Sequence, residues 1–427
     1  MAGRWRVATA VAACWMLAAC WLLTGCPSPA DGEPEPTTAP TAQALPALPT
    51  GASTGLPAYN GPPPDAPPSL GPLLALRAAV DLTPATPGVF ARAQWAVAAP
   101  DGGAHVVLTP ADGDLPQQLV TVGGVSAGYS ITGVVAMPRV VDVWGMHVLP
   151  DGAVVVVGDL EEGSSYGAVV VDPASGTART TAVVPASDDR LSADGRSALS
   201  GSTLYLFLTV QTGSGQLERL AAVDLASDVA PTVRDLVSDV ASASRFPISR
   251  QFGGLVPRPD GGVTLAFDAS PTEDAVLRIP TLLRFDARLE PVGEPVRATD
   301  LAEGGEIQAI SGGVDGTVFL LVEVRDATWL LAVPDGGGAG PVLAQLEDRI
   351  YDYALAVEPA QVWGLLPSPV GVRAVDLTTA EERGPLRLEC GPNFDVRQVL
   401  TAPGGAVLLG ECDDPREDTQ MLWLLGP

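Results

Sequence analysis

From about residue 73 onward, hydrophobic residues occur in short runs separated by turn residues. Residues 148–157 show the pattern best, because the apolar pair Val148-Leu149 is followed by Pro-Asp-Gly and then by four consecutive valines at 154–157. An Asp-Gly pair between two apolar runs is the strongest short-range signal for a β-hairpin. The pattern therefore predicts two antiparallel strands joined by a tight turn at Asp151-Gly152.

The same pattern of an apolar run, a turn and a second apolar run recurs along the chain at intervals of roughly 44 to 59 residues. The turn signals fall at 101–102, 151–152, 201–202, 260–261, 315–316, 359–360 and 404–405. Each interval has room for four short strands, and such a period is typical of a β-propeller with one blade per repeat. A β-sandwich is the alternative, but near-equal repeats favour the propeller. We predict an all-β fold, a seven-bladed β-propeller of four-stranded antiparallel blades, over residues 73–427.

Strand positions within a repeat follow from the apolar pattern. The expected second strands at 203–208, 317–321 and 406–409 are almost continuously apolar, which indicates burial on both faces. The expected first strands carry small residues that suit crowding around a central axis. These small residues are Ala96, Gly145, Gly253, Ala309 and Ala354.

The last repeat lacks a fourth strand, because the chain stops at Pro427 soon after the expected third strand at 421–425. Residues 73–82 form a lone expected strand ahead of the first repeat. An unpaired sheet edge is an aggregation hazard. We therefore expect residues 73–82 to pair with 421–425 and close the ring.

The third expected strand ends in an apolar residue followed by Asp in four repeats, at Val171-Asp172, Val223-Asp224, Phe285-Asp286 and Val375-Asp376. This run resembles the quinoprotein-like and YVTN-type propellers of the bacterial envelope. The tryptophans that dock the quinone in that family do not recur here, so we expect no quinone and no other cofactor.

The N-terminus begins with Arg4 and Arg6, continues with an apolar stretch from Val7 to Leu23, and reaches Leu-Thr-Gly-Cys at Cys26. A charged start before an apolar run is typical of a secretory signal. The Cys26 motif resembles the lipobox of bacterial lipoproteins, which implies lipid attachment to Cys26 and removal of residues 1–25. Cys20 also fits the motif, although it would leave a very apolar mature start. An uncleaved membrane anchor is a further alternative.

Residues 26–72 contain 14 prolines and little else beyond alanine, threonine and glycine. Such a composition cannot bury a core, so we predict a disordered tether. The expected organisation is a signal peptide at 1–25, a tether at 26–72 and a propeller at 73–427.

The formal net charge of −26 repels phosphate backbones, which excludes nucleic acid as a partner class. The charge permits a basic partner or a cation. The simpler interpretation, which we favour, is a solvated acidic surface that maintains solubility.

Two cysteines remain in the expected mature domain, Cys390 and Cys412. In an exported protein such a pair predicts a disulfide, here between the last two blades. Two buried free thiols are the alternative. The two histidines, His105 and His147, lack Glu or Cys at metal-ligand spacing, so we interpret each as a packed or surface residue.

Acidic residues gather in the expected loops between second and third strands, which share one face of a propeller with the connections between blades. This candidate acidic binding face comprises Asp112, Asp114, Asp159, Glu161, Glu162, Glu273, Asp274, Asp413 and Asp414. Protein, carbohydrate or cation ligands all fit such a face. Charged residues also accumulate in loops for solubility alone.

Together these observations predict a monomeric lipoprotein of the bacterial cell envelope, in the outer membrane or periplasm, that acts as a non-enzymatic binding or scaffold module. A metal-dependent, lactonase-like hydrolase and an envelope assembly factor or sensor are the alternatives. Three or more carboxylates converging on the propeller axis would favour the hydrolase.

Overall fold

The computed structural model describes residues 69–426 with gaps. Gaps of four or more residues are 87–90, 161–165, 185–189, 245–251, 271–276, 299–303, 337–341, 347–353, 377–380, 389–392 and 414–417. The expected signal peptide, Cys26 and most of the expected tether lie outside the described residues. The part of the chain that is described contains no helix long and apolar enough to cross a membrane.

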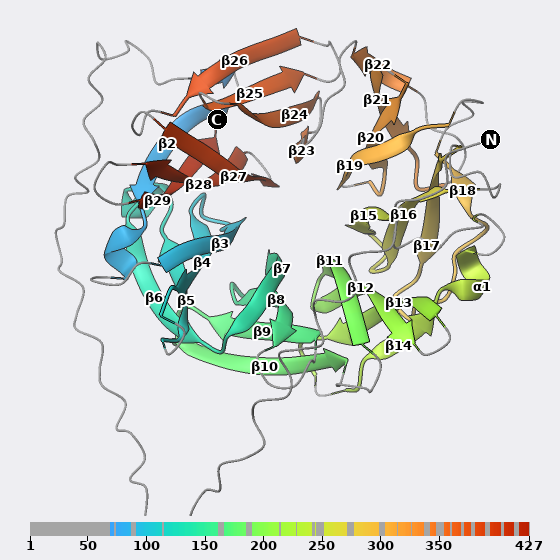
Figure 1. Ribbon diagram of the computed structural model, residues 1–427, viewed down its shortest axis with the longest axis horizontal. Coiled ribbons are helices and arrows are strands. Elements are labelled where there is room, and N and C mark those ends of the chain that lie inside the picture. Colours follow the sequence, from blue (N-terminus) through green and yellow to red (C-terminus); the bar gives the residue numbers. More distant parts are fainter. Residues whose placement is uncertain are drawn as a thin grey trace, which may run out of the picture. The chain divides into compact units, whose positions relative to one another are not determined.

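The described strands form seven antiparallel sheets arranged around a common centre (Figure 1). The innermost strands are β3 (Ala91–Ala98), β7 (Val140–Val148), β11 (Arg190–Ser200), β15 (Phe252–Pro257), β19 (Glu306–Gly312), β23 (Ala354–Glu358) and β27 (Asn393–Ala402). The second strands are β4 (Ala104–Pro110), β8 (Val154–Leu160), β12 (Thr203–Thr212), β16 (Val263–Ala269), β20 (Val318–Val324), β24 (Gln361–Ser368) and β28 (Gly405–Asp413). Each innermost strand contacts the innermost strand of the next sheet, and β27 contacts β3.

Third and fourth strands complete each sheet toward the outside. The third strands are β5 (Gln117–Val122), β9 (Tyr166–Asp172), β13 (Gly215–Asp224), β17 (Ile279–Phe285), β21 (Ala327–Val333), β25 (Gly371–Asp376) and β29 (Asp418–Gly426). The fourth strands are β6 (Ile131–Met137), β10 (Thr177–Val184), β14 (Thr232–Asp235), β18 (Val296–Arg297), β22 (Val342–Leu346), β26 (Glu381–Arg387) and β2 (Leu74–Asp81). The prediction of an all-β propeller of four-stranded antiparallel sheets is confirmed.

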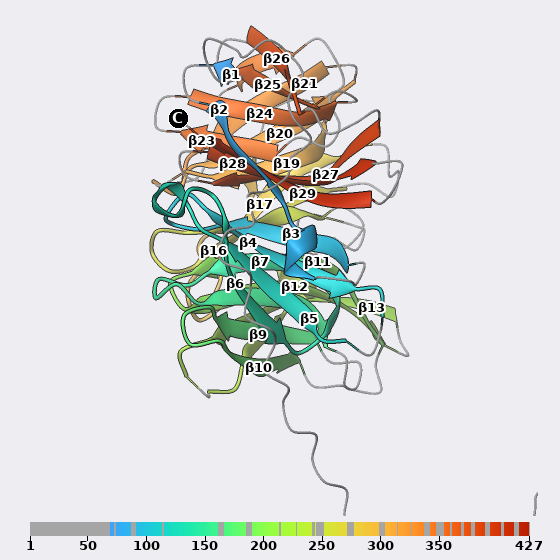
Figure 2. The same cartoon turned by 90° about the vertical axis from the view of Figure 1, so that its left-hand side faces the viewer.

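The closing sheet combines both ends of the domain in the order β1-β2-β29-β28-β27. Ala75 of β2 lies opposite Gly426, and Asp81 lies opposite Met421. The predicted pairing of residues 73–82 with 421–425 is therefore confirmed. A short strand β1 (Ser69–Gly71) adds a fifth strand, on the N-terminal side of the expected domain boundary at residue 73. After β2 the chain runs through η1 (Thr83–Ala85) to β3 (Figure 2).

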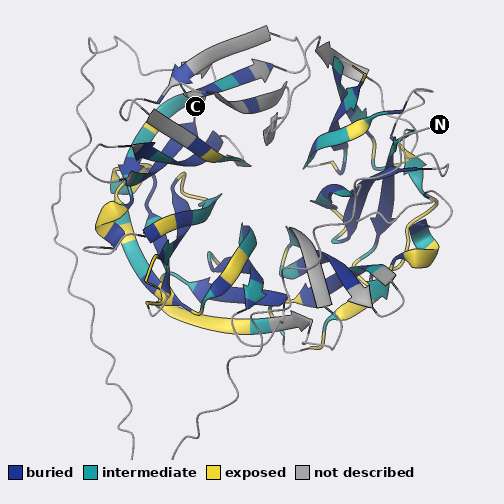
Figure 3. Ribbon diagram, viewed as in Figure 1, coloured by how far each residue is buried: buried dark blue, intermediate teal, exposed yellow. Residues whose placement is uncertain are grey.

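The core lies between neighbouring sheets. One cluster joins Val155 and Val157 of β8 to Leu204 and Leu206 of β12, and the other described clusters likewise combine residues of adjacent sheets. The middle strands are accordingly buried on both faces, whereas exposed residues concentrate on outer strands such as β10 (Figure 3). Burial on two faces explains why the second strands are continuously apolar rather than alternating.

Candidate functional site

Few members of the candidate acidic face lie among the described residues. Asp112 is exposed just after β4. Asp159 lies within β8 and Asp413 lies within β28, so the expectation that these two occupy loops is wrong for both. Both residues still pair with a third strand, since Asp159 lies opposite Tyr166 and Asp413 lies opposite Asp418, and Asp159 is half-buried. The remaining members, Asp114, Glu161, Glu162, Glu273, Asp274 and Asp414, lie outside the described residues.

A layer of polar cross-strand pairs lies at this end of the sheets, which the sequence reasoning missed. Its members occupy the same register position, near the end of the second strand and the start of the third strand, in every sheet except the β23–β26 sheet, where Pro367 lies opposite Val372. The pairs are Thr109–Gln117, Asp159–Tyr166, Thr209–Glu218, Glu323–Thr328 and Glu411–Gln420, with Asp268 opposite Pro280 in the β15–β18 sheet. We call these residues the polar layer.

Three side chains of the polar layer tie one sheet to the next. Gln117 Oε1 accepts a hydrogen bond from the Val140 backbone N–H at 2.7 Å, and Gln420 Oε1 accepts one from Ala93 at 2.9 Å. Both carboxylate oxygens of Asp268 lie 3.1 Å from the backbone nitrogen of Ile307. Each acceptor satisfies an N–H of the neighbouring innermost strand, which would otherwise be buried without a partner. These three side chains are therefore structural joints between neighbouring sheets.

Two carboxyl groups of this layer have raised pKa values. Burial raises the pKa of Asp268 to about 7, against the opposing effect of the Ile307 N–H, because desolvation disfavours the charged form. Burial, and then the nearby Asp142, raise the pKa of Asp159. Among the described residues no group of three metal-ligating side chains could hold a metal ion.

The structure also brings a serine beside a histidine. Ser197 Oγ of β11 lies 2.7 Å from His147 Nε2 of β7, so the contact joins two neighbouring sheets. Burial lowers the pKa of His147 to about 4, which makes the imidazole a weak base. His105 contacts a hydroxyl within its own sheet, with Nδ1 3.1 Å from Oγ1 of Thr121 on the adjacent strand. No described carboxylate makes a hydrogen bond to either imidazole, so both histidines fit the prediction of packed residues.

The opposite end of the sheets is also rich in aspartate, for a conformational reason. Asp101, Asp151 and Asp315 each accept a hydrogen bond from the backbone N–H two residues later in the hairpin turn. Asp172 and Asp224 do the same after third strands. These backbone hydrogen bonds lower the pKa values of Asp224 and Asp315. The pKa of Asp172 is lowered first by the hydroxyl of Ser175 and then by the backbone N–H of Ala174, so all three carboxylates stay ionised. The acidic charge is therefore spread over both ends of the ring.

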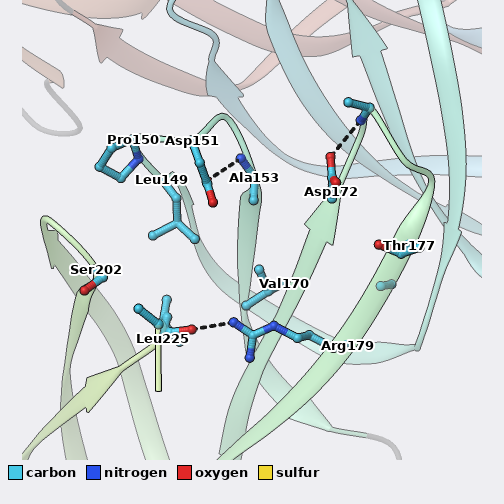
Figure 4. A pocket seen from close by; sticks show the side chains of 13 residues that line it. Leu149, Pro150, Asp151, Ala153, Val170, Asp172, Thr177, Arg179, Ser202 and Leu225 are labelled. Atoms are coloured by element: carbon cyan, nitrogen blue, oxygen red, sulfur yellow. Dashed lines mark hydrogen bonds between the residues drawn. The ribbon is translucent and has the colours of Figure 1, made fainter. Parts of the chain in front are cut away.

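A groove of about 650 Å³ lies between the β7–β10 sheet and the β11–β14 sheet (Figure 4). Its floor is apolar and buried, with Leu149, Val170 and Leu225 between 2% and 8% exposed. Its rim carries polar side chains that are exposed or half-buried: Asp151, Asp172, Thr177, Arg179 and Ser202. A buried apolar floor with a few polar groups around it is the usual composition of a ligand site. This groove is the candidate binding site.

Arg179 spans the groove. Its guanidinium donates a hydrogen bond to the Leu225 backbone carbonyl (Figure 4). It donates another to Thr181 Oγ1. Both acceptors are neutral, and no described carboxylate pairs with Arg179. The sequence contains no signal for this site, because the residues that form the groove come from separate repeats.

Comparisons with known proteins identify solved structures that have a similar fold. No protein family description and no curated protein matches this chain. The structure is similar to a puromycin hydrolase variant solved with PGG, with a TM-score of 0.54 at 16% identity over 80% of this chain. This chain spans about half of that protein, 52% of its length.

Two further solved structures are similar at TM-scores of 0.49. The β-propeller domain of the Trilobed protease from Pyrococcus furiosus matches at 11% identity, with 78% of this chain and 93% of that chain covered. An oligogalacturonate lyase in complex with manganese matches at 12% identity, with 75% and 86% covered. The likeness to the puromycin hydrolase variant, at 16% identity, shows the fold alone.

Proposed function

We propose that this protein is a lipid-anchored, non-enzymatic binding module of the bacterial cell envelope. In this proposal Cys26 carries the lipid, the proline-rich segment holds the ring away from the membrane, and the ring presents the groove to a partner. The observation that carries the binding role is the groove, because it combines a buried apolar floor with a polar rim. Its position between two sheets of a closed ring keeps it preformed, which lowers the entropic cost of binding.

The binding role is tested with a photo-crosslinking amino acid at Thr177, on the groove rim. Thr232 in β14, also exposed and also on a fourth strand, is the matched control position. We expect a discrete adduct in cells from position 177 and none from 232. Ala226→Trp should reduce that adduct, since Ala226 is an exposed groove residue whose enlargement fills the site without disturbing the core. Adducts of equal yield at both positions, or adducts unaffected by Ala226→Trp, would contradict a groove partner.

The anchor is tested separately. Cys26→Ala should move the protein from the membrane fraction to the soluble fraction and abolish metabolic labelling with a fatty acid. Cys20→Ala is the control, and it should change neither result. Labelling that survives Cys26→Ala and disappears with Cys20→Ala would assign the lipid to the other cysteine.

A further inference from the structure

Strand β10 has the longest uncovered outer edge among the described fourth strands. It spans eight residues, Thr177–Val184, and pairs only with β9. Strand β2 is equally long, but β1 pairs with the first two residues of its outer edge, Leu74 and Ala75, which leaves a shorter free edge. Free edges are normally protected by shortness, charge or proline. The sequence Thr-Ala-Arg-Thr-Thr-Ala-Val-Val has no proline, a single charge and several β-branched residues, so this edge is open to another strand.

The single charged residue on this edge, Arg179, also differs from a neighbouring arginine in its hydrogen-bond partners. Arg234, on the fourth strand of the next sheet, forms ion pairs with Asp239 and Glu290. Arg179 has neutral acceptors instead, in a chain whose net charge is −26. An arginine that pairs with no carboxylate of the described residues, held over a partly apolar groove, is electrostatically suited to an acidic side chain.

We propose that an extended peptide segment bearing an acidic residue adds as a strand to the outer edge of β10. Its backbone makes the ladder hydrogen bonds, and its carboxylate meets Arg179 as a cross-strand partner. A neighbouring apolar side chain on the same face reaches the groove floor at Leu225. This inference rests on the proposed binding function and names the class of partner at the same groove.

The segment comes from a separate protein rather than from the tether of this chain. The tether also contains acidic residues, at Asp31, Glu33, Glu35 and Asp65, but prolines lie beside or close to each of them. Proline lacks the N–H that a ladder needs, so these stretches are poor strand donors.

The test selects binders from a displayed library of random dodecapeptides on the full chain in detergent. The same library is selected on Arg179→Gln and on Arg297→Gln. Arg297 is the matched control, since it is an exposed arginine on the fourth strand β18, away from the groove. We expect wild type and Arg297→Gln to enrich peptides with an Asp or Glu among alternating β-branched residues. These peptides, measured by fluorescence anisotropy, should bind Arg179→Gln about tenfold more weakly.

Backbone N-methylation separates strand addition from other binding modes. Methylating alternate amides of an enriched peptide should abolish binding in one register and leave it intact in the other, because only alternate amides of a strand face its partner. The proposal is overturned if no peptide is enriched, if enriched peptides lack acids, or if they bind Arg179→Gln equally well. It is also overturned if neither register is sensitive to methylation. A further contradicting result would be a dimer of this chain that forms through the β10 edge, recognised because Thr180→Pro dissociates it. Groove adducts from Thr177 in cells would still support the binding function in all of these cases.

Discussion

At the scale of single residues, the stability of the ring depends on buried amides that join neighbouring sheets. Gln117 is 1% exposed and bonds both the N–H and the C=O of Val140. It also donates to Thr109 Oγ1 at 2.8 Å. The adjacent Gln118 differs, because its buried Oε1 has no hydrogen-bond partner.

Because only Gln117 makes these hydrogen bonds, replacing each glutamine by alanine should have different effects on stability. Gln117→Ala should lower the free energy of unfolding by about 2–4 kcal/mol, because it leaves two buried backbone groups unpaired. Gln118→Ala should change it by less than about 1 kcal/mol, since no bond is lost. Denaturant titration of the mature protein measures both. Equal effects would show that Gln117 does not act as a joint.

Asp268 predicts a pH dependence. Its folded pKa of about 7 lies above the ordinary value of 3.8, chiefly through burial, with Glu306 raising it further and Arg278 lowering it. The folded state therefore holds the proton more tightly than the unfolded chain. The stabilisation that this provides is complete below about pH 4 and is lost as the pH rises to 7.

Asp268→Asn should remove that dependence, because the amide oxygen still accepts from the Ile307 N–H but carries no charge to desolvate. At pH 8 the variant should be more stable than wild type by on the order of 1–3 kcal/mol, with no gain at pH 4. Asp268→Ala, which loses the joint, should not share the gain. Thermal unfolding at pH 4 and pH 8 measures the stability of each variant. A wild-type protein more stable than Asp268→Asn at pH 8 would contradict the argument that a buried charge on Asp268 destabilises the fold.

At the scale of elements, the hairpins were predictable and the joints between sheets were not. Asp151-Gly152 specifies its turn locally, since Gly152 has φ +88° and Asp151 accepts the N–H of Ala153. The His147–Ser197 contact and the Gln117–Val140 joint connect residues of different repeats, so no local pattern marks them. The groove was missed for the same reason. The small residues predicted for the first strands do lie on innermost strands. At Gly145 the structure gives the reason for the small residue, because a Cβ there would lie 2.5 Å from Ser197 Oγ.

That clash predicts a coupling between two innermost strands. Gly145→Ala should cost about 1–2 kcal/mol, because Ser197 must turn away from His147 and lose its hydrogen bond. In a Ser197→Ala background the same change should cost less, since the nearest remaining atoms, His147 Nε2 at 3.7 Å and Ser197 Cβ at 3.9 Å, lie at ordinary van der Waals distance. Gly152→Ala is the additive control, because its cost of about 1–2 kcal/mol comes from φ alone. A fully additive Gly145–Ser197 cycle would contradict the contact.

At the scale of the whole molecule, the ring depends on one pairing between distant parts of the chain. The third strand of the closing sheet, β29, holds Trp423 and Leu424 at 1% and 3% exposure. Its outer edge is covered by β2, whose Val80 lies opposite Leu422. The pairing was predictable because the last repeat is visibly one strand short. The addition of β1 was not, since three residues carry too little pattern.

Removal of the closing strands should therefore destabilise every sheet and not only the last. Deleting residues 69–81 leaves β29 with an open apolar edge and breaks the ring, so we expect a loss of cooperative unfolding and a tendency to aggregate. Deleting residues 30–60, which precede the described strands, should leave the melting temperature unchanged.

A synthetic peptide of residues 69–82 added in trans should restore a cooperative transition to the chain that lacks residues 69–81. A peptide with Val80→Pro, which lacks one ladder N–H and the buried valine side chain, should restore less. Scanning calorimetry measures each case. An unchanged transition after deletion of 69–81 would show that the sheets hold together without the closing pair, and that contacts between innermost strands alone sustain the ring.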